Sequence, residues 1–115
     1  MDSILTSIKK LLGITEEYVH FDADIIMHIN SVLSTLAQIG VGPSEGFVIT
    51  GDNETWGDFI PENRNLENVK QYVYLNVRLV FDPPTQSSVL DSYQRKINEL
   101  EWRINVTAET PRTNE

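Results

Sequence analysis

Cysteine is absent from this 115-residue chain, which excludes disulfides, thiolate zinc sites and cysteine nucleophiles. Long apolar runs are absent too: no stretch approaches the roughly 18 to 20 residues that a membrane-spanning helix needs. The first residues lack a basic segment followed by a long apolar one, so we expect no signal peptide and a soluble protein. The length and the apolar content suit a single domain with one modest core.

Positive charge is scarce. The chain has 9 Lys and Arg residues against 17 Asp and Glu residues, which gives a net charge of −8. Such a chain is repelled by phosphate backbones unless its few cations cluster, and adjacent cations occur only at residues 9–10 and 95–96. Sequence-specific DNA binding is therefore disfavoured. An acidic surface past which DNA slides without adhering is compatible with this composition.

The chain also lacks a catalytic, metal-binding or phosphate-binding motif. His20, Asp24 and His28 are spaced as metal ligands could be, but no further strong ligand accompanies them, which favours a helix cap and an exposed helix pair. An acidic stretch from residue 52 resembles a calcium loop, yet Trp56 and Asn63 stand where ligands are required. There is no nucleophile elbow and no glycine-rich phosphate loop. We therefore expect no enzymatic activity, no catalytic or metal-binding residues and no cofactor.

What the chain does contain is apolar periodicity typical of helices. Apolar residues at three- and four-residue spacing predict helices over residues 3–12, 22–39 and 88–106. Residues 66–81 are rich in β-formers, but the length of the run favours a helix that starts at residue 63 or 65. The first helix is expected to end at a glycine in position 13, the second to be capped by Asp22, and the third to be buried and stopped by a pair of prolines.

Residues 47–60 differ from the rest. We interpret residues 47–50 as a short strand, residues 51–54 as a turn and residues 55–60 as a returning strand, with a long ordered loop as the alternative. The expected fold is therefore mainly α. It is a small bundle of about four helices with a β-hairpin or long loop between helices two and three and an extended C-terminal tail. The expected domain covers residues 1–106, followed by a flexible tail over residues 107–115.

The order of these elements resembles the small head–tail connector proteins of tailed bacteriophages, also called adaptor or head-completion proteins. The resemblance lies in the opening Ile4-Leu5…Ile8-Lys9…Leu11-Leu12-Gly13-Ile14, in the second helix led by Asp22, and in Leu66 to Phe81 with Arg78 near its end. It covers roughly residues 3–106. The chain departs from this family after the third helix, where Val80-Phe81-Asp82-Pro83-Pro84 replaces the usual basic residue and glycine.

The resemblance implies a structural virion protein of the phage neck, made in the bacterial host cytoplasm. Copies would form a ring, commonly dodecameric, beneath the portal vertex, extend the DNA channel and provide a platform for the stopper and tail. The implied partners are further copies of the chain, the portal protein, a stopper or tail-completion protein, and double-stranded DNA that passes without sequence-specific binding. No membrane is involved.

Carried onto this chain, the resemblance gives candidate interaction residues. The candidates for portal docking are Trp102, Arg103, Ile104, Val106, Thr107, Pro111 and Arg112. The candidates for contacts with the lumen or the next ring are Asp52, Glu54, Trp56 and Asp58, although packing of the tryptophan against its own domain is favoured. A cyclic ring needs two different complementary faces, and the candidates for inter-subunit contact are Ile4, Ile8 and Leu11. The first helix could equally dock on its own core.

A second interpretation keeps a binding role but changes the partner. The chain would be a small acidic dimeric regulator whose last helix forms a coiled coil and which binds a host protein. A helix-turn-helix DNA-binding protein ranks third, because the net charge and the loop of roughly 20 residues between helices two and three oppose it. An enzyme ranks last.

Overall fold

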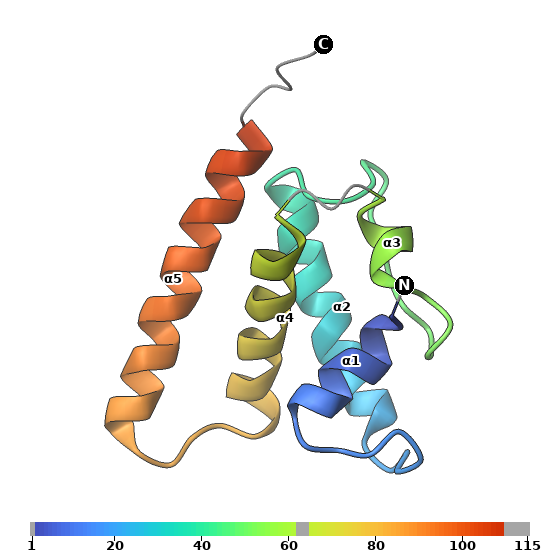
Figure 1. Ribbon diagram of the computed structural model, residues 1–115, viewed down its shortest axis with the longest axis vertical. Helices are drawn as coiled ribbons and strands as arrows, with labels where there is room; N and C mark the ends of the chain where they lie inside the picture. The colour runs from blue at the N-terminus through green and yellow to red at the C-terminus, as the bar shows by residue number, and fades with distance from the viewer. Residues whose placement is uncertain (1, 62–64, 110–115) are drawn as a thin grey trace.

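The computed structural model describes residues 2–61 and 65–109, and its helices are shown in Figure 1. The elements in chain order are α1 (Ile4–Leu11), α2 (Asp22–Gln38), α3 (Trp56–Phe59), α4 (Leu66–Phe81) and α5 (Ser87–Glu109). The predicted mainly α fold is confirmed; α4 begins directly after Asn65, one of the two predicted starts, and ends before the prolines as predicted. α5 continues to Glu109, beyond the predicted end at Val106. The division of the chain at residue 106 stays a prediction, and residues 110–115 lie outside the described part.

The helix α4 lies at the centre of the bundle. It packs against α2 on one side and α5 on the other, while α1 contacts both α2 and α4 (Figure 1). α5 therefore stands at one edge with α4 as its principal neighbour. Within the described residues, no helix has the length and apolar content needed to cross a membrane.

The short helix α1 is fixed by a cap at each end. The Ser3 side chain accepts a hydrogen bond from the Thr6 backbone amide at 3.2 Å, as an N-cap does. At the other end Gly13 has a φ of +82°, and the amide of Ile14 donates to the carbonyl of Lys9 at 2.9 Å. This is a Schellman ending, which a residue with a Cβ enters only with strain. The predicted start and end of this helix are confirmed.

The prediction that Asp22 caps α2 is wrong. Phe21 occupies the N-cap position and makes no side-chain capping hydrogen bond. Asp22 is the first helical residue, and its carboxylate is turned toward α1, where it pairs with the Lys9 ammonium at 2.8 Å. The Asp22 carboxylate thereby compensates the charge of the buried Lys9 ammonium. The end of α2 is as predicted, with Gly40 at a φ of +92°.

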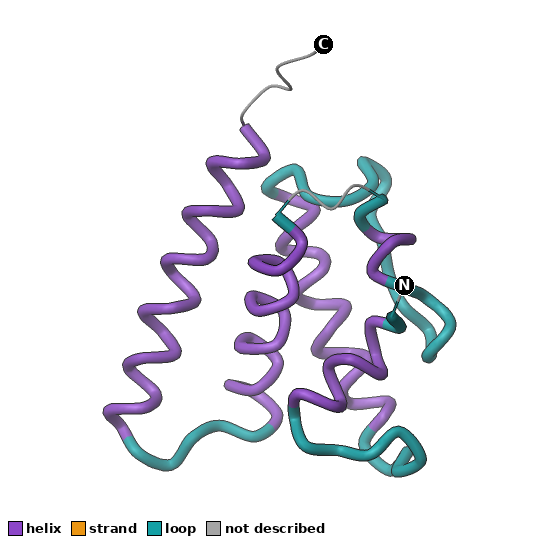
Figure 2. The backbone as a smooth tube through the Cα atoms, viewed as in Figure 1, coloured by secondary structure: helices purple, strands orange, loops and turns teal. Residues whose placement is uncertain are grey.

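The predicted β-hairpin over residues 47–60 is also wrong. Figure 2 shows helix and loop but no strand in the described chain. The backbone before α3 pairs instead with the N-terminus, through an isolated antiparallel bridge between Ser3 and Thr55 and a hydrogen bond from the Ile4 amide to the Glu54 carbonyl at 3.0 Å. Thr55 and Asp58 then form a capping box that starts the one-turn helix α3. The segment is therefore an ordered loop that is hydrogen-bonded to the start of α1.

The core is a single cluster to which every described helix contributes. Trp56 and Phe59 of α3 are 0% and 1% exposed, so this short helix acts as a plug of two aromatic rings. The Trp56 indole nitrogen donates to the Ser7 hydroxyl at 2.8 Å, which satisfies its polar atom inside the core. The fully buried aliphatic residues with 0% exposure are Ile4, Ile8, Ile25, Ile29, Leu33, Leu36, Val73, Val77 and Leu100.

Lys9 is buried within this fold although it is charged, with an exposed fraction of 2%. Its ammonium pairs with Asp22 at 2.8 Å and donates to the carbonyl of Glu16 at 3.1 Å. It thereby ties the end of α1 to the loop after it and to the start of α2.

We expect Lys9→Met to lower the free energy of unfolding by about 2 kcal/mol, because it leaves a partly buried carboxylate and a carbonyl without their cation. Urea denaturation would measure this change, with Lys10→Met, at an exposed neighbour, as the matched control expected within about 0.5 kcal/mol of the parent. The double variant Lys9→Met/Asp22→Asn should recover part of the loss. Equal stability of Lys9→Met and the parent would show that the pair contributes nothing.

Candidate functional site

The outer surface of α5 carries the most exposed large aromatic side chain of the described fold. Trp102 is 68% exposed, on the side of α5 turned away from α4, and Val106 one turn later is 41% exposed. Arg103 is beside them, and its guanidinium pairs weakly with Glu99 at 3.6 Å. An exposed tryptophan next to an arginine is a composition enriched at protein interfaces. This surface is a candidate for binding a partner.

The inner side of α5 is occupied by α4. Ile97, Leu100 and Ile104 are 7%, 0% and 1% exposed and belong to the core. Ile104 therefore cannot dock on another protein as expected from the sequence, because its own α4 covers it. The same burial removes the apolar heptad stripe that a coiled-coil dimer through α5 would need.

Polar contacts hold α5 at its place on α4. The Tyr72 hydroxyl donates to the Glu101 carboxylate at 2.8 Å. Burial raises the pKa of Tyr72 well above its usual value, and the hydrogen bond and charge of Glu101 raise it further, so the hydroxyl remains a donor at physiological pH. On the other flank, the Arg78 guanidinium lies 5.8 Å from the centre of the Tyr93 ring. The Arg78 contact is a cation–π interaction.

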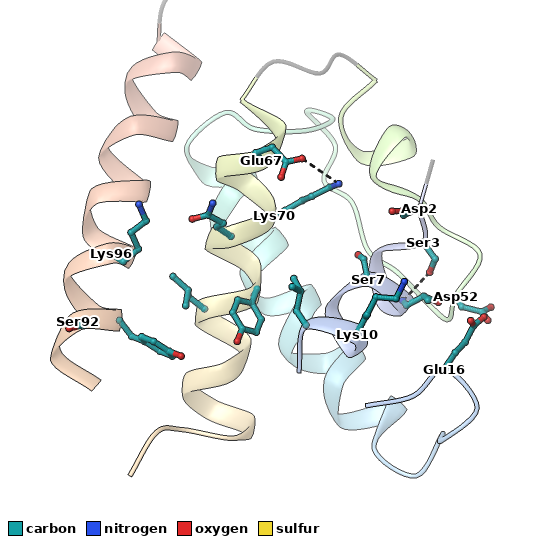
Figure 3. A pocket seen from close by; sticks show the side chains of 16 residues that line it. Asp2, Ser3, Ser7, Lys10, Glu16, Asp52, Glu67, Lys70, Ser92 and Lys96 are labelled. Carbon is teal, nitrogen blue, oxygen red and sulfur yellow. Dashed lines mark hydrogen bonds and ion pairs between the residues drawn. The ribbon is translucent and has the colours of Figure 1, made fainter. Parts of the chain in front are cut away.

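A groove of about 940 Å³ opens beside the contact between α4 and α5 (Figure 3). α4 forms its floor with Gln71 and Tyr74, α1 forms one wall, and α5 forms the other with Tyr93. Leu11 of α1 lines it and is 52% exposed, so an apolar side chain is in contact with water there. The groove thus combines exposed apolar surface with a concave shape.

Charged side chains surround the groove. Each of its three helices contributes one lysine, and Figure 3 shows three carboxylates gathered at the α1 side. The Lys70 ammonium is 3.7 Å from Glu67 and 5.9 Å from the centre of the Trp56 ring, and the Lys96 ammonium is 3.0 Å from Glu99. The lysines are Lys10, Lys70 and Lys96, and the carboxylates at the α1 side are Asp2, Glu16 and Asp52.

In the acidic loop predicted to face the lumen or the next ring, three of the four candidate residues are buried or hydrogen-bonded within the domain. Trp56 is buried and is not a surface contact. Asp58 accepts from the Thr55 amide at 3.0 Å, within the capping box of α3. Burial acts to raise the pKa of Glu54, but hydrogen bonds from its own backbone and from Thr50 hold that pKa below its usual value. Asp52 is exposed and is the member of this set best placed for an external contact.

Of the inter-subunit candidates on α1, two are buried and one is exposed. Ile4 and Ile8 are each 0% exposed, because α1 packs on α2 and α4, so the expected contact with a neighbouring copy is not open to them in this fold. Leu11 is exposed in the groove. Among the portal candidates, the Thr107 hydroxyl donates to the Arg103 carbonyl at 3.0 Å, while Pro111 and Arg112 lie outside the described residues.

The groove and the buried Lys9 were missed from the sequence. The groove is formed by three helices that are far apart in the chain, and no local pattern predicts such a meeting. The pairing of Lys9 with Asp22 also joins two separate elements. α3 did have a signal, because Thr55 followed three residues later by Asp58 is a variant of the capping box.

Comparison with known families finds a match over nearly the whole chain. The model of the family described as Phage connector protein covers residues 4–111, which include every described helix. Comparison with curated proteins and with solved structures finds no match. Since the matched region is nearly the whole chain, the protein belongs to the phage connector family, which consists of structural proteins of bacteriophages.

Proposed function

We propose that this protein is a head–tail connector of a tailed bacteriophage, and that copies of it form a ring beneath the portal vertex. The ring extends the DNA channel and carries the stopper and tail. The match of residues 4–111 to the phage connector family is the observation that carries this proposal. The ring, the portal contact and the channel go beyond that match and rest on the surfaces described above.

The partner of the α5 end is the portal protein in this proposal. Val106 at this end is 41% exposed, and α5 leads directly into the last residues of the chain. Val106, Thr107, Pro111 and Arg112 are the proposed contacts. A peptide that continues from a rigid helix can bind a groove of a partner with a defined starting point.

The negative charge fits a channel through which DNA moves. A net charge of −8 repels the phosphate backbone, so the ring does not retain DNA during packaging or ejection. Exposed Asp52, together with the neighbouring acids of the loop before α3, is the proposed surface toward the lumen or the next ring.

The proposed portal contact can be tested by truncation. A chain ending at Val106 lacks the last turn of α5 and the residues after it, but it retains Ile97, Leu100 and Ile104, the buried residues that hold α5 on α4. We expect this protein to fold with an unchanged melting temperature. We expect its incorporation into phage particles to fall at least tenfold, which corresponds to about 1.4 kcal/mol of lost binding free energy.

A second truncation after Glu109 is the control that keeps α5 intact as described. Loss of incorporation by both truncated proteins would assign the portal contact to residues 110–115, and loss by the shorter one alone would assign it to the last turn of α5. Normal incorporation of both proteins would contradict the proposed portal contact. A parent protein that never enters particles would contradict the connector role itself.

A further inference from the structure

The groove and the outer surface of α5 complement one another in shape. The first is a concavity of about 940 Å³ with exposed Leu11 and half-buried Tyr74 in its lining, and the second presents Trp102, a side chain that is 68% exposed. Both carry apolar area in contact with water, and joining them would remove that area from water.

They also complement one another in charge. Arg95 and Arg103 flank Trp102 on α5, and residues 95–103 hold these two cations and Lys96 against the two acids Glu99 and Glu101. At the α1 side of the groove, Asp2, Glu16 and Asp52 are exposed carboxylates. Lys10 lies on the same wall of the groove, where these acids outnumber it. In a chain with a net charge of −8, setting Arg95 and Arg103 against Asp2 and Glu16 lowers the repulsion between copies.

One molecule cannot join its own two surfaces. The wall that α5 contributes to the groove contains Lys96, and Trp102 comes six residues later, about a third of a turn away around the helix axis. The groove of a molecule therefore opens beside its own α5 while its Trp102 points elsewhere. A contact between Trp102 and the groove must therefore involve two copies.

We propose that Trp102 of one copy inserts into the groove between α1 and α5 of the next copy, with Arg95 and Arg103 directed toward Asp2 and Glu16. The two surfaces are different, so the contact is heterologous and can repeat from copy to copy around a ring. The inference rests on the proposed ring and names the faces that build it. It assigns Trp102 and Arg103 to the neighbouring copy and leaves Val106 and the residues after it to the portal.

Photocrosslinking in assembled phage particles tests this contact. Trp102 is replaced by the photoreactive aromatic residue p-benzoylphenylalanine, a change expected to leave folding intact because the side chain is exposed. Irradiation should produce adducts at multiples of the chain mass, and peptide mapping should place the attachment on α1 or α4 residues of the groove. The same replacement at Met27, a 60% exposed residue of α2, is the matched control and should give no adduct in the groove.

Other results would overturn the inference in distinct ways. An adduct between residue 102 and the portal protein, or no adduct in particles that contain the variant, would remove the assigned faces and leave the connector role standing. Absence of even the parent protein from particles would remove the connector role as well.

If the photoreactive variant fails to assemble, a pair of introduced cysteines tests the same contact between copies. The natural chain has no cysteine, so Asn98→Cys on the Trp102 side of α5 and Gln71→Cys on the groove floor introduce the only thiols. In particles that carry the double variant, a short bis-maleimide should link neighbouring copies of the chain, which gives a ladder of trimers and larger species on a denaturing gel. In particles that carry either single variant, the copies should stay unlinked. Dimers from Asn98→Cys alone would show an α5-to-α5 contact and overturn the proposal, as would an absent ladder in the double variant.

Discussion

Trp56→Ala is expected to lower the free energy of unfolding by about 3 to 5 kcal/mol, the range typical of removing a buried tryptophan. The side chain is 0% exposed, its nitrogen donates to the Ser7 hydroxyl at 2.8 Å, and Lys70 lies over its ring. A small domain is stable by only about 5 to 15 kcal/mol in total, so this loss would unfold a large fraction of the protein. Chemical denaturation followed by far-UV circular dichroism would measure it.

Trp102→Ala is the matched control, because it removes the same side chain from an exposed position. Its effect on unfolding should remain within about 0.5 kcal/mol. Ser7→Ala should cost about 1 kcal/mol, as it removes one hydrogen-bond partner of the indole. Equal destabilisation by the two tryptophan variants would refute the assignment of Trp56 to the core and Trp102 to the surface.

Gly42→Ala is expected to destabilise the protein by about 2 to 5 kcal/mol. Gly42 has a φ of +88°, which costs a residue with a Cβ about 1 to 2 kcal/mol. A Cβ at this position would also overlap the ring of Phe59, which is 1% exposed, and crowding of a packed core costs about 1 to 3 kcal/mol more. The melting temperature should fall by roughly 10 °C or more, at about 4 to 8 °C per kcal/mol for a domain near this size.

Gly46→Ala separates these two contributions. Gly46 has a φ of +93°, but no atom lies within 4 Å of a Cβ placed there. This variant should therefore show the backbone strain alone, about 1 to 2 kcal/mol. If Gly46→Ala proves as damaging as Gly42→Ala, close contact with Phe59 is not what requires a glycine at position 42.

The four longer helices could be predicted from the sequence because each has its own apolar periodicity. In α4 that periodicity outweighed a composition rich in β-formers, since a run of this length is too long for a typical strand. The paired prolines after Asp82 fixed its end. Both features are local, so they act in the same way whatever the tertiary contacts of the helix are.

Residues 47–60 could not be predicted in the same way because tertiary contacts decide their conformation. Ile49 is 1% exposed, and its amide donates to the Asn30 side chain at 2.8 Å. α2 thus takes the hydrogen bond that a partner strand would have made. The Ser3–Thr55 bridge similarly uses the N-terminus in place of a second strand.

The interaction surfaces were predicted only in part, since a sequence shows which residues are apolar but not which are covered. Ile8 and Leu11 belong to the same stripe of α1, yet the first is 0% and the second 52% exposed. Ile8 lies in the core, whereas Leu11, the last residue of α1, lines the groove. Trp102 could be recognised as an outlier from the sequence alone, because it falls off the apolar stripe of α5 that contains Ile97, Leu100 and Ile104.

The seam between the N-terminus and the loop before α3 also constrains the order of events on the ribosome. The amide of Ile4 bonds to the carbonyl of Glu54, a residue synthesised 50 positions later. At about 5 to 20 residues per second, the N-terminal residues wait roughly 3 to 10 seconds for this partner. α1 can pack on α2 before then, but the hydrogen bond that ties its first residue to the loop before α3, and its contacts with α4, form only after these later residues are synthesised.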